Sequence, residues 1–194
     1  MKKFALTITA ILAAAALAGC TSAPSSSSAP SSVPSSSAPS SAPASQAASG
    51  STAAGVTMAS SLTEIMDAVL AGAPADQLPM LLPADLNGGE KYAPLTEENS
   101  EYNLGVARDR YADGIDAEAA MSSVPFSVCL VQANSADEAE QLAADIEANA
   151  NPRKWVCVEA ESKIVDRSGD KVILIMASTD LANQLHAAFT ALAQ

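Results

Sequence analysis

The chain has 194 residues, a formal charge of −12 and an aromatic content of only 4%. All 22 acidic side chains lie after residue 55, together with eight of the ten basic ones, so this part carries a formal charge of −14. A domain of that charge is repelled by bare nucleic acid and by anionic lipid headgroups, and no basic stripe offsets it. Nucleic-acid partners are therefore not expected.

A basic head, Met1-Lys2-Lys3, precedes an uncharged apolar run over residues 4–19. The run is shorter than the ~20 residues that a membrane-spanning helix needs, so residues 1–19 are typical of a secretory signal peptide. Leu17-Ala18-Gly19-Cys20 resembles the lipobox of bacterial lipoproteins. The resemblance implies cleavage before Cys20, attachment of fatty acyl chains such as palmitate, and a lipid-anchored position on the cell membrane, facing outside the cytoplasm. An ordinary secretory signal with a chance cysteine, or an uncleaved apolar anchor, is the alternative.

The segment from residue 21 to residue 55 contains neither a charged nor an aromatic residue, and Ser, Ala and Pro dominate it. It has too little apolar surface to offset the entropy lost on ordering, so residues 20–55 are predicted to be a lipidated cysteine followed by a disordered linker. Two roles stay open for this linker. It is either a spacer that holds a domain away from the membrane or a connector without a function of its own.

Residues 56–194 are long enough for one acidic domain with a hydrophobic core. Two capping boxes mark helix starts in it, because Ser61 precedes Glu64, and Ser135 precedes Glu138, by three residues. Apolar residues at helical spacing follow both boxes and predict helices over 61–71 and from 136 to about 149. Thr179 is the predicted cap of a last helix.

Strands are predicted where apolar and β-branched residues alternate or run together. These segments are 101–111, 126–133, 154–160 and 171–177, the last of them buried on both faces. The rest is predicted as a loop over 73–100, a short helical turn starting near Asp116 and a tight turn over 167–170. The resulting order, α-β-β-α-β-β-α, predicts an α+β single domain in which helices pack on an about four-stranded, mostly antiparallel sheet.

Four segments of this domain form a series, at 112–116 (ADGID), 126–133 (FSVCLVQA), 153–158 (RKWVCV) and 169–176 (GDKVILIM). The series resembles an uncharacterised family of small exported lipoproteins of Gram-positive anaerobes, classed as a domain of unknown function. The resemblance covers about residues 61–192. It implies export and a compact α+β fold, and it brings no catalytic residues, because none are established for that family.

Catalytic and metal-binding signatures are sparse. His186 is the single histidine, and no G-x-S-x-G elbow occurs, so no nucleophile–histidine pair is predicted. Residues 109–120 do not fit an EF-hand loop, because the last position lacks the bidentate glutamate. A looser cation site at Asp113, Asp116 and Glu118 is the alternative to a turn followed by an acid-rich helix start. No catalytic residue, metal or cofactor is therefore predicted.

Cys129 and Cys157 both lie in predicted strands, each opposite the more apolar face of its strand. If these strands are neighbours, a disulfide is geometrically feasible and an exported protein could keep it, whereas an anaerobic niche favours two free thiols. Arg153, Lys154 and Trp155 form a candidate partner contact if the indole is exposed. If the first helix covers that face, the ring is buried instead.

These observations predict a membrane-anchored extracytoplasmic lipoprotein. Its domain is expected to act as a non-catalytic binding or accessory module at the cell envelope, with an envelope protein or peptide as its partner. The alternative is an extracytoplasmic hydrolase whose site no motif reveals.

Overall fold

The computed structural model of this protein describes residues 55–194. The predicted signal peptide, the lipidation site at Cys20 and all but the last residue of the predicted linker lie outside the described residues. The helices are α1 Leu62–Leu70, α2 Ser100–Leu104, α3 Ala136–Asn149 and α4 Thr179–Ala191, with short 3-10 helices η1 Ala84–Leu86 and η2 Arg108–Arg110. The strands are β1 Ala93–Pro94, β2 Tyr111–Glu118, β3 Ser127–Ala133, β4 Ser162–Ser168 and β5 Lys171–Ala177.

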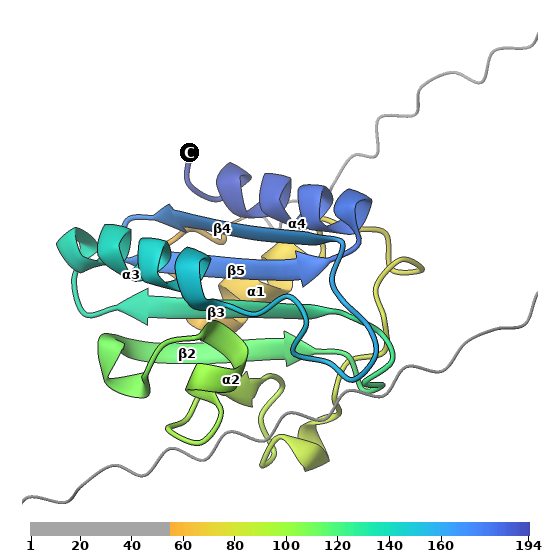
Figure 1. The fold of residues 1–194 in the computed structure, drawn as a ribbon. Coiled ribbons are helices and arrows are strands. Elements are labelled where there is room, and N and C mark those ends of the chain that lie inside the picture. The colour runs from red at the N-terminus through yellow and green to blue at the C-terminus, as the bar shows by residue number, and fades with distance from the viewer. Residues whose placement is uncertain (1–54) are drawn as a thin grey trace, which may run out of the picture. The chain divides into compact units, whose positions relative to one another are not determined.

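Within residues 55–194, the five strands form one antiparallel sheet in the order β1-β2-β3-β5-β4 (Figure 1). The α+β class predicted from the sequence is confirmed, although the sheet has five strands rather than four. β4 and β5 form a hairpin in which Ser168 pairs with Lys171, so the predicted tight turn is present and Gly169 occupies the left-handed region at φ 58°.

Helix starts follow the predicted caps. The Ser61 hydroxyl accepts a hydrogen bond from the Glu64 N–H, and the Glu64 carboxylate accepts one from the Ser61 N–H, which completes the capping box of α1. Ser135 caps α3 by accepting from the Glu138 N–H. The last helix begins one residue earlier than predicted, because Thr179 is its first residue rather than its cap.

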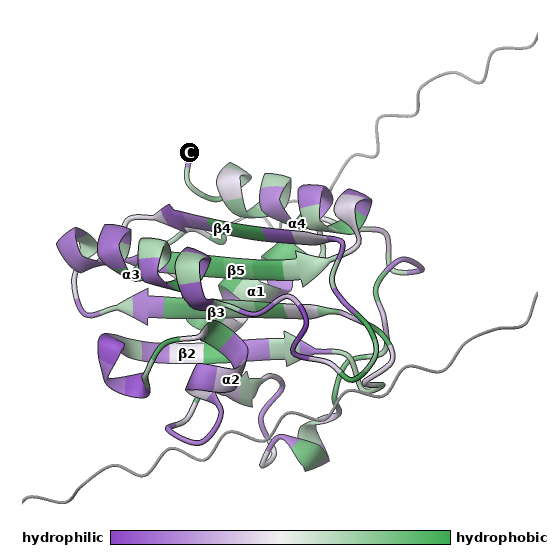
Figure 2. Cartoon of the chain, in the orientation of Figure 1, coloured by the Kyte–Doolittle hydropathy of each residue, from purple (hydrophilic) through white to green (hydrophobic). Residues whose placement is uncertain are grey.

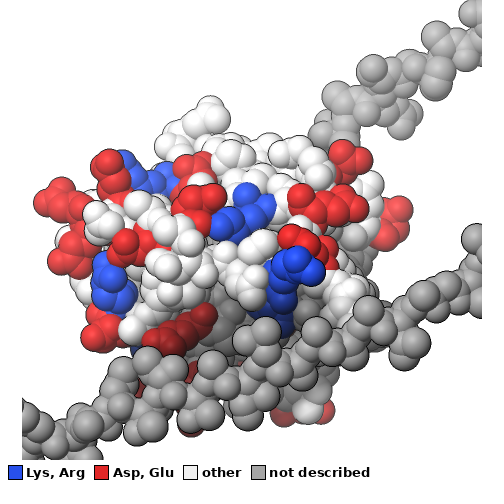
Figure 3. Space-filling model, viewed as in Figure 1, with Lys and Arg blue, Asp and Glu red and all other residues white. Residues whose placement is uncertain are grey.

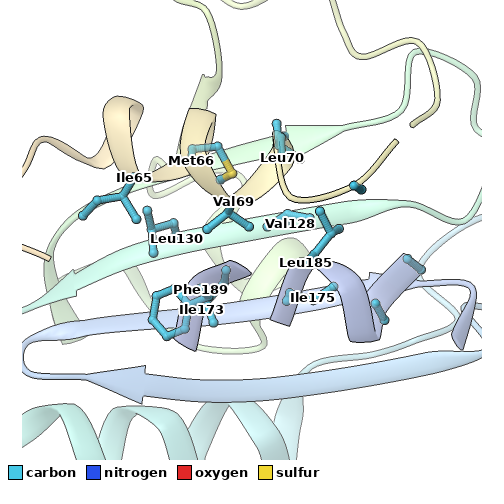
Figure 4. Close-up of a cluster of buried hydrophobic side chains, with 14 of the residues drawn as sticks. Ile65, Met66, Val69, Leu70, Val128, Leu130, Ile173, Ile175, Leu185 and Phe189 are labelled. Carbon is cyan, nitrogen blue, oxygen red and sulfur yellow. The ribbon is translucent and has the colours of Figure 1, made fainter. Parts of the chain in front are cut away.

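The core lies on both faces of the sheet, because side chains alternate between the two faces along β3 and β5. On one face, α1 and α4 pack against the sheet through Ile65, Met66, Val69, Leu185 and Phe189, which meet Val128, Leu130, Ile173 and Ile175 (Figure 4). On the other face, α2 and α3 pack through Leu104, Leu142 and Ile146 onto Val131, Val172 and Leu174. All seven residues of β5 are buried, as predicted, and Figure 2 shows this strand as strongly hydrophobic.

Three local predictions are wrong. The segment 101–111 is not a strand but contains most of α2 and all of η2. The two helices are separate because Gly105, in the left-handed region, ends α2. Asp116 lies in β2 rather than in a helical turn. Residues 154–160 form no strand, since Lys154 and Trp155 both point into the protein while Val156 is 78% exposed.

Candidate functional site

A buried polar cluster lies between the sheet and the layer that contains α2 and α3. In the register of β2 and β3, Asp116 lies opposite Cys129 and Glu118 lies opposite Ser127. Directly opposite residues project from the same face of a sheet, so these four side chains gather on one face. Lys154, from the loop between α3 and β4, reaches into the same place.

The Lys154 ammonium is the centre of the cluster. Its Nζ donates to Asn103 Oδ1 at 2.5 Å and to Ser127 Oγ at 3.1 Å, and it lies 3.4 Å from Glu118 Oε1. Ser127 Oγ in turn donates to Asp116 Oδ1 at 2.9 Å. The serine hydroxyl therefore links the buried cation to a second carboxylate.

Two aromatic rings close the cluster. The Lys154 ammonium lies 5.2 Å from the centroid of Tyr102 and 5.1 Å from that of Trp155, and the Trp155 Nε1 donates to Glu118 Oε1 at 3.1 Å. Lys154 and Trp155 are buried, so the prediction that they form an exposed partner contact is wrong. Arg153 stays exposed. The indole belongs to the core on the side of α2 and α3, and not to the side that α1 covers.

The protonation states follow from this burial. Burial raises the pKa of Asp116 from 3.8 to about 6, although the Lys154 charge opposes the rise. Burial alone would lower the pKa of Lys154, but nearby negative charge, chiefly that of Asp116, raises it above its usual value. Burial and the Asp116 charge raise the pKa of the Cys129 thiol well above its usual value. At neutral pH, Lys154 therefore carries its proton and Cys129 is a neutral thiol.

This chemistry excludes a hydrolase of the serine–lysine type at the cluster. Such a mechanism needs an unprotonated lysine that takes the proton of a reachable serine. Lys154 is held in its protonated form, and Ser127 is fully buried. The cluster is instead a satisfied structural network, since no buried side-chain N or O atom lacks a hydrogen-bond partner in the described part of the chain.

The three acids of the looser cation site do not come together in the structure. Asp116 and Glu118 do meet a cation, but that cation is the Lys154 ammonium. Asp113 is exposed, and its carboxylate accepts the N–H of Gly114. Among residues 55–194, no three His, Cys, Asp or Glu side chains are grouped so that they could hold a metal ion.

The remaining predicted site residues do not come together. His186 Nε2 lies 2.7 Å from Asp166 Oδ2 between α4 and β4, and no hydroxyl or thiol hydrogen-bonds to the ring within residues 55–194. Cys129 is buried in β3, whereas Cys157 is exposed in a loop, and both are free thiols. The disulfide alternative is therefore absent from the structure, because the segment that carries Cys157 is not a neighbouring strand.

An open cleft of about 470 Å³ lies beside the first turn of α4, on the side of the sheet that α1 and α4 cover. Three loops meet there, at residues 76–79, 124–126 and 159–161. Its floor is apolar and is formed mainly by Leu78, Val124, Phe126 and Leu181, while its rim carries Asp76, Glu159 and Glu161. We call this feature the acidic cleft.

The rim carboxylates differ in their contacts. Glu161 accepts the Thr179 N–H at 3.2 Å and so occupies the N-terminus of α4. Glu159 lies 3.4 Å from the Arg153 guanidinium, with both groups exposed to solvent. Asp76 makes no ion pair within the described residues. A second hollow, which shares Gln77, Ser178 and Leu181 with the cleft, continues along α4 past Asp180, Asn183 and Gln184.

Two exposed methionines lie next to the cleft in the chain. Met80, 73% exposed, follows Pro79 of the lining, and its carbonyl accepts the Ala120 N–H at 2.8 Å. Met121 is 56% exposed, and its carbonyl accepts the N–H of Val124, another lining residue. Methionine is flexible and polarisable, and it is common on surfaces that bind varied partners.

Neither the polar cluster nor the acidic cleft was found from the sequence. The cluster depends on β2, which was not recognised as a strand, so the shared face of Asp116, Glu118 and Ser127 was hidden. The cleft depends on three loops that are far apart in the chain. Met80 and the acids at 159 and 161 were visible signals, but nothing in their spacing placed them together.

No family model, curated protein or solved structure matches this chain. The comparisons thus provide no catalytic family or homologue, and nothing positive supports an enzymatic activity. The lipobox and the resemblance to the family of exported lipoproteins stay predictions. None of the helices within residues 55–194 has the length and apolarity needed to cross a membrane.

Proposed function

We propose that this protein is a lipid-anchored extracytoplasmic lipoprotein whose folded part is a non-catalytic binding or accessory module at the cell envelope. The anchor is assigned to Cys20, on the strength of the Leu17–Cys20 motif. The long uncharged Ser/Ala/Pro segment after it would then hold the module away from the membrane.

The acidic cleft is the observation that carries the binding role. It combines an apolar floor with a few polar groups from separate segments, which is the usual composition of a ligand site. The buried polar cluster, by contrast, offers no reachable nucleophile and no free base. A hydrolase therefore has no observation in its favour, and binding is the function that the geometry supports best.

Partner capture from native membranes tests the module. The full chain is compared with a variant that ends after residue 55, which keeps the predicted anchor and linker, and with Val124→Arg, which places a long cationic side chain in the cleft. Leu86→Arg is the matched control, because Leu86 is 69% exposed and does not line the cleft. We expect a protein or peptide that the full chain and Leu86→Arg retain and the other two lose. Recovery of the same proteins by all four would refute the proposal.

Fatty-acid labelling in the native host tests the anchor separately. Cys20→Ala should abolish incorporation of labelled palmitate, since no other thiol stands behind a lipobox. Cys157→Ala is the control and should leave incorporation unchanged. Undiminished labelling of Cys20→Ala would contradict the lipoprotein assignment.

A further inference from the structure

We infer that the acidic cleft binds a cationic amphipathic peptide segment, in which apolar side chains alternate with lysine or arginine. This inference rests on the binding role proposed above and names the chemistry of the partner. A cleft of about 470 Å³ accommodates a few side chains, so the ligand is a short segment rather than a whole domain face.

The apolar part of the ligand is set by the floor. Phe126 and Leu181 are buried members of the core that α1 and α4 cover, and Leu78 and Val124 are half-buried at its margin. The core of the domain thus reaches the surface at this point. An apolar side chain placed there would remove further hydrocarbon surface from water, which favours binding in proportion to the area covered.

The charge of the ligand is set by the rim. Asp76, Glu159 and Glu161 surround the floor, and Arg153 is the one basic residue seen to pair with any of them in the described part of the chain. That pair is exposed at both ends, so a ligand cation can compete for Glu159 at little cost. Acidic side chains also predominate on the face of the molecule shown in Figure 3. A cationic segment is therefore attracted at long range and paired at the rim.

An anionic ligand is disfavoured at the same place. The N-terminus of α4 opens toward the cleft, and helix N-termini attract anions. However, the Glu161 carboxylate already accepts the Thr179 N–H there, and Asp180 adds a second negative charge to the first helical turn. An incoming phosphate or carboxylate would meet these charges, and among the described residues no lysine or arginine lines the cleft.

The probe is a fluorescent peptide of alternating leucine and lysine, titrated into the full chain. Two further peptides vary one property each: leucine with glutamate reverses the charge, and serine with lysine removes the apolar side chains. We expect at least tenfold weaker binding of both, and weaker binding of the first peptide as salt is raised. Equal affinity for all three would overturn the inference.

Matched triple variants separate the cleft from the overall charge. Asp76→Asn with Glu159→Gln and Glu161→Gln removes the rim charges, while amide oxygens still cap α4. Glu90→Gln with Glu97→Gln and Glu98→Gln removes the same number of charges from exposed positions that do not line the cleft. The rim triple should weaken probe binding about tenfold, as three modest ion pairs would, and the other triple by less than about twofold. Equal effects would show non-specific attraction and overturn the inference.

The two proposals fail in different ways. If native membranes yield a partner that Val124→Arg loses, yet the leucine–lysine probe does not bind the full chain, the binding role stands and the inferred ligand chemistry is wrong. If the probe binds through the rim but no cleft-dependent partner is captured, the chemistry stands and the envelope role is wrong. Both triple variants are prepared in the same buffer and detergent as the full chain. Any peptide that binds to the detergent then contributes equally to every titration and drops out of the comparison.

Discussion

Asp116→Asn is expected to remove a pH-dependent weakness from the fold. In the unfolded chain this carboxyl has a pKa near 3.8, and burial raises it to about 6 in the folded protein. Between these values the folded state binds the proton more tightly, so stability falls as the pH rises from about 4 to 6. The shift corresponds to about 3 kcal/mol of stability, which is fully present below the unfolded pKa and is lost once the pH has risen above about 6. Asparagine resembles the protonated acid, so the variant should escape this loss.

Urea unfolding, followed through the fluorescence of the single tryptophan, measures the effect. Trp155 is buried beside the cluster, so its emission reports the loss of this region. Relative to the wild-type protein, Asp116→Asn should gain about 3 kcal/mol of unfolding free energy between pH 4 and pH 7. Asp113→Asn, an exposed position on the same strand, should differ from wild type by less than about 0.5 kcal/mol throughout. A constant difference between Asp116→Asn and wild type across this range would refute the reasoning.

Three substitutions and one labelling experiment test other parts of the structure. Gly105→Ala should destabilise by about 2 to 4 kcal/mol in urea unfolding, because Gly105 has φ 73° and an added Cβ would collide with the backbone at the end of α3. Gly169→Ala, at φ 58° with open space around it, should lose only about 1 kcal/mol; equal losses would contradict the collision. Phe189→Ala should cost about 3 to 5 kcal/mol in the same assay, since the ring is fully buried, and a loss below about 1 kcal/mol would contradict its place in the core. Peptide mass mapping after maleimide treatment should find Cys157 modified in the folded protein and Cys129 only after unfolding; early modification of Cys129 would show that the cluster opens.

Elements marked by an unambiguous local pattern were predicted correctly from the sequence. A serine three residues before a glutamate is typical of a helix N-terminus, and the two such pairs, Ser61 with Glu64 and Ser135 with Glu138, begin α1 and α3. After Lys171, every residue from 172 to 177 is apolar, and such a short β-branched run is typical of a strand that is buried on both faces. The α+β class followed from these elements.

Predictions failed where tertiary contacts override a local pattern. The β2 strand carries two acids, Asp116 and Glu118, on the face that packs toward α2 and α3, so the usual alternation of apolar and polar residues was hidden. An acid is tolerated there because Ser127 donates to it and Lys154 lies nearby, and neither contact can be read from the strand itself. The strand predicted at 154–160 is wrong because a polar residue there is buried. Lys154 points inward, where it donates to Asn103 and Ser127, which are far away in the chain.

The polar cluster and the acidic cleft are connected through one loop. Lys154 holds this loop to α2 and β3 through Asn103 and Ser127, and its own carbonyl accepts the Tyr102 hydroxyl at 2.9 Å. Ala160 donates its N–H to the Pro152 carbonyl at 2.9 Å, so the loop is closed on itself between the rim residues Glu159 and Glu161. A buried ion network rarely adds net stability over an apolar one, but loss of one partner is costly, which makes it suited to fixing a single conformation. Lys154→Met should therefore weaken probe binding at the cleft as well as the fold, although Lys154 does not line the cleft. A variant that loses stability while binding the leucine–lysine peptide with unchanged affinity would show that the rim is positioned without the cluster.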